Sequence, residues 1–592
     1  MMTDRSRSTA RGTVRVCLVL VCLALLPASV ALGQTELRYD RATGRNTLSY
    51  PPDRHFDHRH LRLDLDIEDM DSLKADVRVT LDVAARGRPR SALRLNVGRL
   101  IEIDSISVNG RSAAFTRADP DLTIAIDPPA PVGKTVEVVI EYRIDAEGTA
   151  GAIGGMSWEA GNPRSRNPNE HAGQIHTQGQ PEFTRLWLPS HDHPNEKMTT
   201  EIIAVVPDGF QVLSNGRLLS DDHDAGDPTA DGRRRWHWLQ DKPHPIYLVT
   251  LVVGTFEILT LADQPTPMRV WAPLGRAEQC REVFKDTERM MAFFKDRFGP
   301  YPWAKYDQIV PRNYTMGAME NTSASTFYIL AASSDSRAQR DIIAHELIHQ
   351  WFGNLVTCES WEHIWLNEGW ASMGEALWAE EEARQAGGDP DAAYTGKIAR
   401  FLSAQRLNQT SSPTFPALAS KQYIQAFETF FKPDNPYTKG ALVLHMLRRK
   451  LGDEAFFRGS RDYLERHAFG SADTDDFRRA LEDASGLSLE RFFEQWVMRP
   501  GIPRLSIEIE WDDAASAVVV RVEQDQHIDQ KNPAYAFDLP VRIEGDSGVH
   551  TEIIAVDGRL SEASFGLRAK PQRVLIDPEL HITARTRVDS EL

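Results

Sequence analysis

The chain has 592 residues, of which 41% are hydrophobic and 26% are charged, a composition typical of soluble globular proteins with room for three or four domains. Its formal net charge of −17 argues against a polyanionic partner, and after the N-terminal segment no run of Lys or Arg counters that charge. We therefore expect no nucleic-acid partner.

The N-terminal segment is typical of a secretory signal. Arginines precede an apolar run over residues 16–26, and the small-residue sequence Ala31-Leu32-Gly33 follows. We expect cleavage near Gln34, which removes residues 1–33 and leaves a periplasmic or secreted protein. An uncleaved anchor is the alternative, but the apolar run is shorter than the ~20 residues of a spanning helix, so we expect no stable membrane anchor.

Residues 34–258 have the pattern of an antiparallel β domain. Apolar and charged residues alternate in several segments, and further strands are expected later in this range, so that strands are predicted at 61–67, 77–83, 136–144, 202–206 and 246–253. Between residues 148 and 195 the alternation lapses. A long irregular segment inside a domain is usually functional or disordered, and this one contains Thr177-Gln178-Gly179-Gln180-Pro181.

Over residues 259–500 the hydrophobic period becomes helical. The apolar spacing predicts helices at 283–298, 340–355, 398–407, 437–451, 475–484 and 489–497. Strand-like alternation returns after residue 500, which predicts a small β-sandwich over 501–592. Outside the signal the chain has two cysteines, Cys280 and Cys358, and their spacing does not indicate whether they pair.

The predicted helix at 340–355 contains the sequence His345-Glu346-Leu347-Ile348-His349. Residues four apart lie on one helix face, so both histidines can direct a nitrogen at one metal ion, and Glu346 is left beside it. A catalytic zinc takes three protein ligands and keeps an open position, and Glu368 on the next predicted helix can complete the set. We predict one zinc ion at this site.

The alternative is a solvated helix face with two incidental histidines. The apolar neighbours of the motif argue against it, because they predict a buried helix, where unpaired His and Glu side chains are costly.

Two further motifs flank the predicted metal site. One is a loop before the zinc helix, Gly317-Ala318-Met319-Glu320-Asn321, and the other is Asn435-Pro436-Tyr437-Thr438-Lys439-Gly440, in which a tyrosine opens a predicted helix. Taken alone, a glutamate in such a loop is most often solvated, and such a tyrosine is often packed in the core.

The order and spacing of these motifs resemble the gluzincin zinc aminopeptidases, the family that includes aminopeptidase N and leukotriene hydrolase. The resemblance covers nearly the whole mature chain. It implies a multidomain α+β fold with an N-terminal antiparallel β saddle, a thermolysin-like, mainly helical catalytic domain and a small β-sandwich. Family members usually add a C-terminal helical domain, but this sequence ends after the predicted sandwich, so we expect none.

The resemblance also implies roles for individual residues. His345, His349 and Glu368 resemble the zinc ligands of the family, and Glu346 resembles the general base that takes a proton from a zinc-activated water. Tyr437 resembles the tyrosine that donates a hydrogen bond to the oxyanion.

The loop at 317–321 looks like the family's exopeptidase motif, in which Glu320 grips the free α-ammonium of a peptide, and Gln180 matches the second amine-binding position. The implied partners are peptides with a free N-terminus, and the implied activity is that of a zinc aminopeptidase. A bifunctional peptidase and epoxide hydrolase is the first alternative, but Lys432 and Thr429 do not match the Tyr and Asp associated with epoxide opening. An inactive zinc-containing peptide-binding protein is the second, against which the intact Glu346 and Tyr437 argue. The sequence does not indicate an oligomeric state.

Overall fold

The structure is a computed structural model that describes residues 51–221, 225–328, 336–408, 416–420, 426–530, 532–546 and 548–591. The predicted signal at 1–33 lies outside these residues. Among the helices in the described part of the chain, none is long and apolar enough to cross a membrane.

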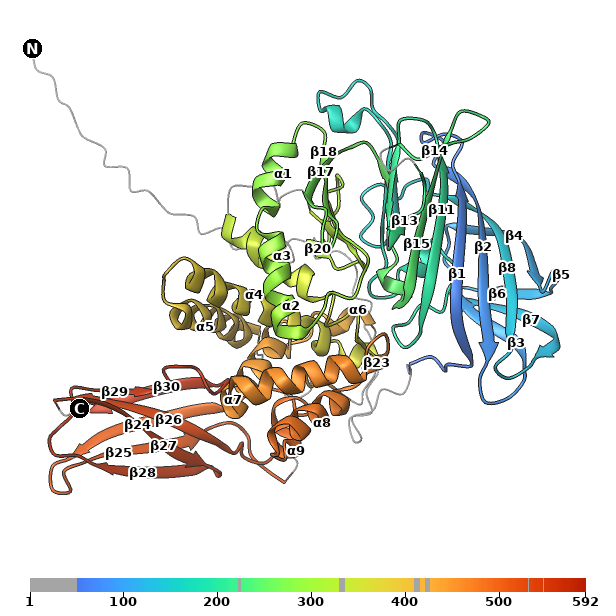
Figure 1. Cartoon of the computed structure of the whole chain (residues 1–592). Helices are drawn as coiled ribbons and strands as arrows, with labels where there is room; N and C mark the ends of the chain where they lie inside the picture. Colours follow the sequence, from blue (N-terminus) through green and yellow to red (C-terminus); the bar gives the residue numbers. More distant parts are fainter. Residues whose placement is uncertain are drawn as a thin grey trace, which may run out of the picture. The chain divides into compact units, whose positions relative to one another are not determined.

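The N-terminal region is built around a nine-stranded sheet with the order β13-β15-β11-β1-β2-β8-β4-β5, to which β14 adds beside β15 (Figure 1). Its long strands alternate buried apolar and exposed polar residues, as the sequence predicts for a sheet with one solvated face. The strands are β1 (Phe56–Asp66), β2 (Lys74–Ala85), β4 (Ile101–Val108), β5 (Arg111–Ser112), β8 (Thr135–Asp145), β11 (Lys197–Val206), β13 (Arg217–Leu218), β14 (Asp227–Pro228) and β15 (Arg234–Pro245).

The prediction of a wholly antiparallel domain is wrong at one pair. Strands β1 and β11 run parallel, with Leu61 beside Thr200. A parallel pair needs a long connection, and here more than a hundred residues separate the two strands along the chain.

Two smaller sheets complete the N-terminal region, in the orders β12-β16-β10-β9 and β3-β7-β6. Their strands are β3 (Arg90–Asn96), β6 (Phe115–Ala118), β7 (Asp121–Ala130), β9 (Gly155–Glu159), β10 (Gln174–Gln178), β12 (Gln211–Ser214) and β16 (Leu251–Gly254). The stretch at 148–195 is therefore not irregular throughout. Every residue of β10 is buried, which removes the alternation that marks a half-exposed strand.

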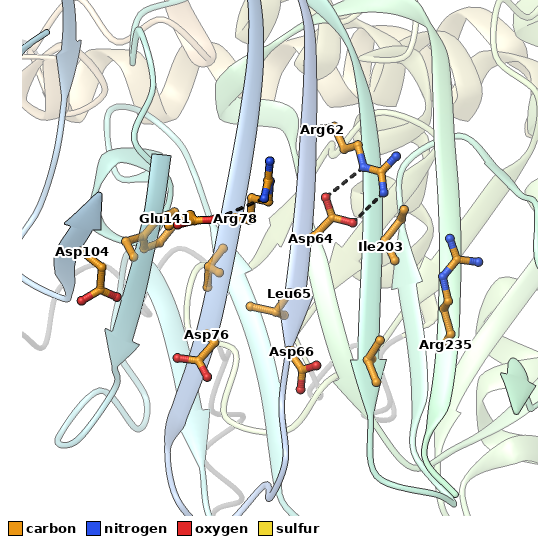
Figure 2. Close-up of a pocket in the computed structure, with 13 residues that line it drawn as sticks. Arg62, Asp64, Leu65, Asp66, Asp76, Arg78, Asp104, Glu141, Ile203 and Arg235 are labelled. Atoms are coloured by element: carbon orange, nitrogen blue, oxygen red, sulfur yellow. Dashed lines mark hydrogen bonds and ion pairs between the residues drawn. The ribbon is translucent and has the colours of Figure 1, made fainter. Parts of the chain in front are cut away.

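A charged groove of about 450 Å³ lies on the exposed face of the nine-stranded sheet (Figure 2). Its charges pair with one another, since Arg62 contacts Asp64 at 2.8 Å and Arg78 contacts Glu141 at 3.2 Å. None of the residues predicted for the metal or substrate site lines this groove.

The catalytic region combines helices with a five-stranded mixed sheet of order β17-β18-β19-β21-β20. The sheet consists of β17 (Phe256–Ala262), β18 (Met268–Pro273), β19 (Tyr306–Ile309), β20 (Ala318–Met319) and β21 (Ala324–Phe327), and β22 (Thr357–Cys358) pairs with β23 (Ser471–Ala472). The helices are α1 (Ala277–Phe284), α2 (Thr287–Phe298), α3 (Ser336–Ile348), α4 (Trp365–Gln385), α5 (Pro390–Asn408), α6 (Ala426–Thr429), α7 (Thr438–Arg466), α8 (Thr474–Ser485) and α9 (Glu490–Trp496).

Several helices differ from their predicted extents; α5, for example, begins at Pro390 and not at residue 398. The single helix predicted at 283–298 is two, α1 and α2, which a break near Asp286 separates. Helix α7 runs beyond residue 451 and contains Gly452 in a non-helical conformation, with φ of 74°, so the chain kinks there.

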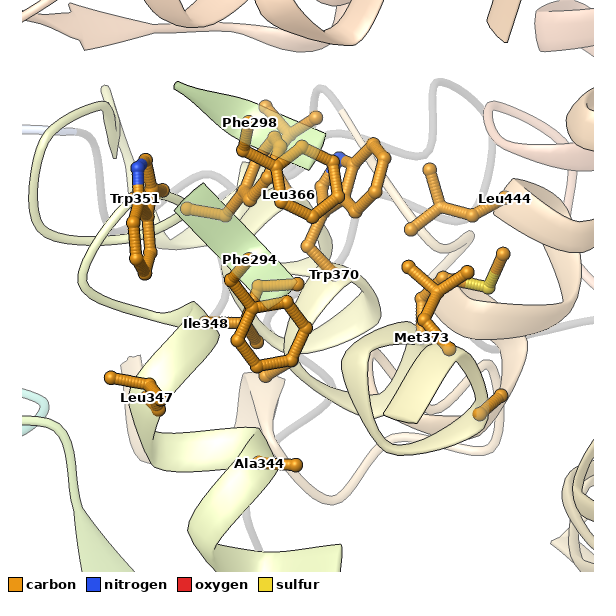
Figure 3. Close-up of a cluster of buried hydrophobic side chains, with 14 of the residues drawn as sticks. Phe294, Phe298, Ala344, Leu347, Ile348, Trp351, Leu366, Trp370, Met373 and Leu444 are labelled. Carbon is orange, nitrogen blue, oxygen red and sulfur yellow. The ribbon is translucent and has the colours of Figure 1, made fainter. Parts of the chain in front are cut away.

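An aromatic core holds α3 and α4 together (Figure 3). Phe352, just after α3, stacks on Trp370 of α4 with ring centroids 4.0 Å apart, and Phe298 of α2 packs against both rings. Each such fully buried side chain contributes roughly 1.5–3 kcal/mol relative to exposure. A buried aromatic cluster therefore holds together the two helices on or next to which the predicted zinc ligands lie.

The C-terminal residues form two sheets, β28-β25-β24-β30 and β27-β26-β29, which share an apolar core. The strands are β24 (Arg504–Asp512), β25 (Ala517–Gln524), β26 (Phe537–Gly545), β27 (Gly548–Val556), β28 (Leu560–Gly566), β29 (Arg573–Ile576) and β30 (Arg585–Glu591). Cys280 and Cys358 are both buried and free, so they do not pair with each other.

Candidate metal and substrate site

The three predicted zinc ligands converge. His345 lies on α3, His349 directly follows it, and Glu368 lies in the first turn of α4; their ligand atoms all lie within 4.8 Å of one another. Glu368 Oε2 is 3.5 Å from His345 Nε2 and 3.4 Å from His349 Nε2. Two imidazoles and a carboxylate are a donor set that zinc favours, and three ligands leave an open position.

Helix α3 ends at Ile348, not at residue 355 as the sequence predicts. The His349 N–H still donates to the His345 carbonyl, with N and O 3.4 Å apart, so the two imidazoles keep the spacing of one turn. Beyond it the chain turns at Gly353, whose φ of 125° is unfavourable for any residue with a side chain. A Cβ at that position would lie 3.1 Å from His349 Nδ1, so glycine leaves room for the imidazole.

The other ring nitrogens of the two histidines have acceptors. His345 Nδ1 lies 3.0 Å from Glu375 Oε1, and His349 Nδ1 lies 3.0 Å from the Phe352 carbonyl oxygen. Each acceptor favours a proton on Nδ1 and leaves the Nε2 lone pair for a metal. Sequence reasoning did not identify Glu375, although it lies seven residues after Glu368 on the same helix, a spacing that places both on one face.

A buried charge cluster supports that contact. Lys397 of α5 lies 2.6 Å from Glu375 and 2.6 Å from Asp341 of α3. Burial alone would raise the pKa of Glu375, but Lys397 and His345 hold it below its usual range, so the carboxylate remains an acceptor for the imidazole. No local sequence signal identifies Lys397, because its partners are on other helices.

Glu346 lies beside the ligands and is only 5% exposed. Among the residues that the structure describes, its Oε2 has no hydrogen-bond partner. Burial raises the pKa of this carboxyl, and the neighbouring carboxylates of Glu320 and Glu368 add to the effect. A divalent cation held by the three ligands would favour the charged form instead. A buried acceptor without a fixed partner fits a group that exchanges a proton with the fourth ligand of a metal.

Tyr437 directly precedes α7, and its ring lies nearly parallel to that of His345, with centroids 6.0 Å apart. The centroid of the Tyr437 ring is also 6.5 Å from that of Phe430, and the ring packs against an apolar cluster. Burial raises the pKa of the phenol well above its usual value, and the site's carboxylates reinforce this. The hydroxyl therefore stays protonated and can donate a hydrogen bond.

Gln180 and Glu320 reach the site from different parts of the chain. Gln180 Nε2 is 3.4 Å from Glu320 Oε1 and 3.4 Å from Glu368 Oε1, which brings the predicted amine-binding residues next to a predicted zinc ligand. Glu320 is 3% exposed, and burial raises the pKa of its carboxyl while His349 opposes the shift. Gln178 belongs to the motif at 177–181, but no role was predicted for it; it accepts a hydrogen bond from Tyr314 and donates one to the Met319 sulfur.

The rest of the predicted loop is ordered around Glu320. Gly317 has φ of 78°, Ala318 and Met319 form β20, and Asn321 donates to the Leu248 carbonyl. The structure thus brings Gln180, Glu320 and Tyr437 together with the three predicted zinc ligands, and the other residues of the loop at 317–321 adjoin Glu320 along the chain. The two positions considered for epoxide opening are both buried, and Lys432 donates to the carbonyls of Ala417 and Leu418 at 2.8 and 2.6 Å.

Comparison with known proteins identifies the family of the chain. The family models for the Peptidase family M1 domain and the Peptidase M1 N-terminal domain match residues 283–496 and 53–248. The chain is similar to Aminopeptidase N of Streptomyces lividans, 29% identical over 71% of this chain and 47% of that protein. It is also similar to Aminopeptidase M1 of Arabidopsis thaliana, 30% identical over 58% of this chain and 39% of that protein.

A third relative is Probable aminopeptidase 1 of Saccharolobus solfataricus, 28% identical over 68% of this chain and 50% of that protein. The chain therefore spans about half the length of these relatives or less. Both family models describe parts of one architecture, a β-rich N-terminal domain followed by a helical catalytic domain, and together they match most of the chain. The chain belongs to peptidase family M1, the gluzincin family of the aminopeptidase N type.

Proposed function

We propose that this protein is a zinc-dependent aminopeptidase that hydrolyses the first peptide bond of peptides with a free N-terminus. The contact of Gln180 with both Glu320 and Glu368 carries the proposal. It supports a chain-end acceptor directly beside the metal ligands. An α-ammonium anchored there would leave room for one residue before a carbonyl reaches the metal, which favours cleavage after that residue.

The residues around the ligands can perform the chemistry. A zinc ion on His345, His349 and Glu368 would polarise a carbonyl and lower the pKa of water toward ~7. Glu346 is placed to accept the proton of the attacking water and pass it to the leaving amine. Tyr437 can donate a hydrogen bond to the carbonyl oxygen as that atom gains negative charge.

Recognition of the free amine would depend on one buried carboxylate. Glu320 supplies the negative charge, and Gln180 supplies a neutral amide oxygen as a second acceptor. A blocked N-terminus would leave the buried Glu320 carboxylate beside a neutral group. The carboxylate would then lack a charged partner, which makes binding unfavourable. This arrangement favours substrates with an unblocked N-terminus.

An unblocked aminoacyl chromogenic substrate tests the proposal. The zinc-loaded protein should release the chromophore, and chelator treatment or His345→Ala should abolish the release, because both remove the metal. Absence of release at micromolar enzyme, with zinc bound, would instead support an inactive zinc-containing peptide-binding protein.

We also propose that the protein is exported, because residues 1–33 have the charged, apolar and small-residue segments of a cleavable signal.

A further inference from the structure

The backbone of Glu320 is hydrogen-bonded to residues of the proposed zinc-binding segment, 345–354. Its carbonyl oxygen accepts hydrogen bonds from Gln350 Nε2 at 3.0 Å and from Asn354 Nδ2 at 2.8 Å. Gln350 is the residue directly after His349, and both amide side chains are fully buried. The proposed ammonium acceptor and a proposed zinc ligand are therefore linked through one short stretch of chain.

Gln350 binds the loop at a second point. Its Oε1 accepts a hydrogen bond from the Ser323 N–H at 2.9 Å, so one amide holds both ends of the segment 320–323. Ser323 has φ of 64°, in the left-handed region that is unfavourable for a residue with a side chain. Such a conformation persists only where the surroundings fix it, and it occurs most often at functional sites.

Residues outside the predicted zinc-binding segment also hold residues 320–323. Gly216 N–H donates to Ser323 Oγ at 2.8 Å, and Asn215 Nδ2 donates to the Thr322 carbonyl at 2.8 Å. Lys305 donates to the Ser323 carbonyl at 3.1 Å. Loss of the Gln350 amide would therefore leave the segment attached to the N-terminal region and the sheet, but would weaken its connection to the zinc-binding segment.

We propose that Gln350, assisted by Asn354, is a positioning residue that fixes the distance between the Glu320 carboxylate and the metal ligands. This distance would allow one substrate residue to lie between the bound α-ammonium and the peptide bond that is cleaved. This inference rests on the proposed aminopeptidase function, in which Glu320 grips the ammonium. A displacement of about 1 Å at a reacting centre can cost about 10²-fold in rate, so a small shift of the loop is enough to matter.

The test is a double-mutant cycle between Gln350→Met and Glu320→Ala. Methionine keeps the length and apolar volume of the side chain but removes both amide contacts. Gln350→Met should keep about one zinc per chain and lower kcat/KM for an unblocked aminoacyl substrate about 10- to 10²-fold. In the Glu320→Ala background the same substitution should change kcat/KM less than about threefold, because residues that act through one another are not additive.

Gln524→Met is the matched control. Gln524 is also fully buried, and its amide also binds one backbone residue at both ends, Tyr535, but it lies in the C-terminal sandwich. Its substitution should lower the melting temperature without a comparable loss of kcat/KM. Asn354→Ala removes only one donor to Glu320, so it should cause a smaller loss of kcat/KM that also depends on Glu320. This variant replaces Gln350→Met in the test if Gln350→Met does not fold.

Three results would overturn the inference: the same loss of kcat/KM in both backgrounds, loss of zinc from Gln350→Met, or an equal loss in Gln524→Met. The proposed function fails separately, if the zinc-loaded wild type does not turn over unblocked substrates at all.

Discussion

At the scale of single residues, Glu346 and the ligands beside it have separable roles. Glu346→Gln keeps the shape of the side chain but cannot accept a proton, so it should retain about one zinc per chain and lose nearly all activity. His345→Ala removes one of three ligands and should lose both zinc and activity. Metal analysis and turnover of an unblocked aminoacyl substrate, measured on the same preparations, check both expectations.

The activity and zinc content of Glu346→Gln test whether Glu346 is the general base. If Glu346→Gln turned over at a rate near that of the wild type, another group would have to carry the proton. If it lost zinc together with activity, the carboxylate would be needed to build the site, and the loss would say nothing about proton transfer.

Tyr437 packs against Phe430 and also lies beside His345, so its hydroxyl must be tested apart from its ring. Tyr437→Phe keeps the ring and removes the donor. We expect kcat to fall roughly 10²–10³-fold with KM within a few-fold, because the hydrogen bond strengthens as the carbonyl oxygen becomes charged. A kcat within threefold of wild type, with zinc content and melting temperature unchanged, would restrict Tyr437 to packing.

At the scale of elements, the crossing of α4 and α7 relates Glu368 to Tyr437. A Cβ on Gly440 would lie 2.8 Å from the Cα of Gly369, so the helices meet at two glycines with no room for a side chain. Gly440→Ala should separate them and lower the free energy of unfolding by about 1–3 kcal/mol. Because the crossing lies next to both site residues, kcat should fall as well, which thermal unfolding and kinetics on one sample would show.

Gly396→Ala is the control for that change. Gly396 lies on the exposed side of α5, and a Cβ there would meet nothing within 4 Å. Alanine favours the helix over glycine by about 1 kcal/mol, so this variant should be as stable as wild type or more so, with unchanged kcat. A Gly440→Ala variant as stable and active as Gly396→Ala would show that the close crossing is not required.

Hydrophobic periodicity correctly predicted the elements whose buried and exposed residues alternate regularly. It failed for elements whose burial or ends depend on tertiary contacts. Strand β1 and helix α8 follow the expected alternation and helical spacing closely. Strand β10 was missed because both of its faces are covered, and the end of α3 was misplaced because apolar residues at helical spacing continue past Ile348 to Leu355. Patterns within one segment do not contain such information.

Some residues of the candidate site could likewise be predicted from local spacing, whereas others could not. The spacing of His345, His349 and Glu368 suggested a metal site from the sequence alone, since two of them share one helix turn. The roles given to Gln180 and Glu320 came from a family resemblance, because 140 residues separate them and only the fold brings them into contact. Contacts such as that of Lys397 with Glu375 were not predictable, because they depend on how separate helices pack.

At the scale of the whole molecule, the site needs two regions of the chain. Gln180 follows a strand of the N-terminal region, whereas Glu320 and Glu368 belong to the catalytic region. We expect the catalytic region expressed alone to bind zinc more readily than it binds substrate, since the three proposed ligands belong to it, whereas Gln180, a proposed amine-binding residue, does not.

The proposed export can be tested on the protein that includes residues 1–33. Expressed with its own leader in a Gram-negative host, the chain should appear in the periplasmic fraction with a new N-terminus near Gln34. N-terminal sequencing of the purified protein checks the cleavage. An intact N-terminus on protein found only in the cytoplasmic fraction would contradict the proposal.

In the proposed mechanism the buried carboxylate of Glu320 selects the free end of a peptide and presents the first bond to the metal. The most direct measurement compares one peptide with a free and with an acetylated N-terminus, with the products identified by mass spectrometry. We expect release of the first residue from the free peptide, no cleavage of the acetylated one, and severe loss of the first reaction in Glu320→Ala. Comparable cleavage of both peptides, or cleavage at internal bonds, would contradict it and indicate an endopeptidase.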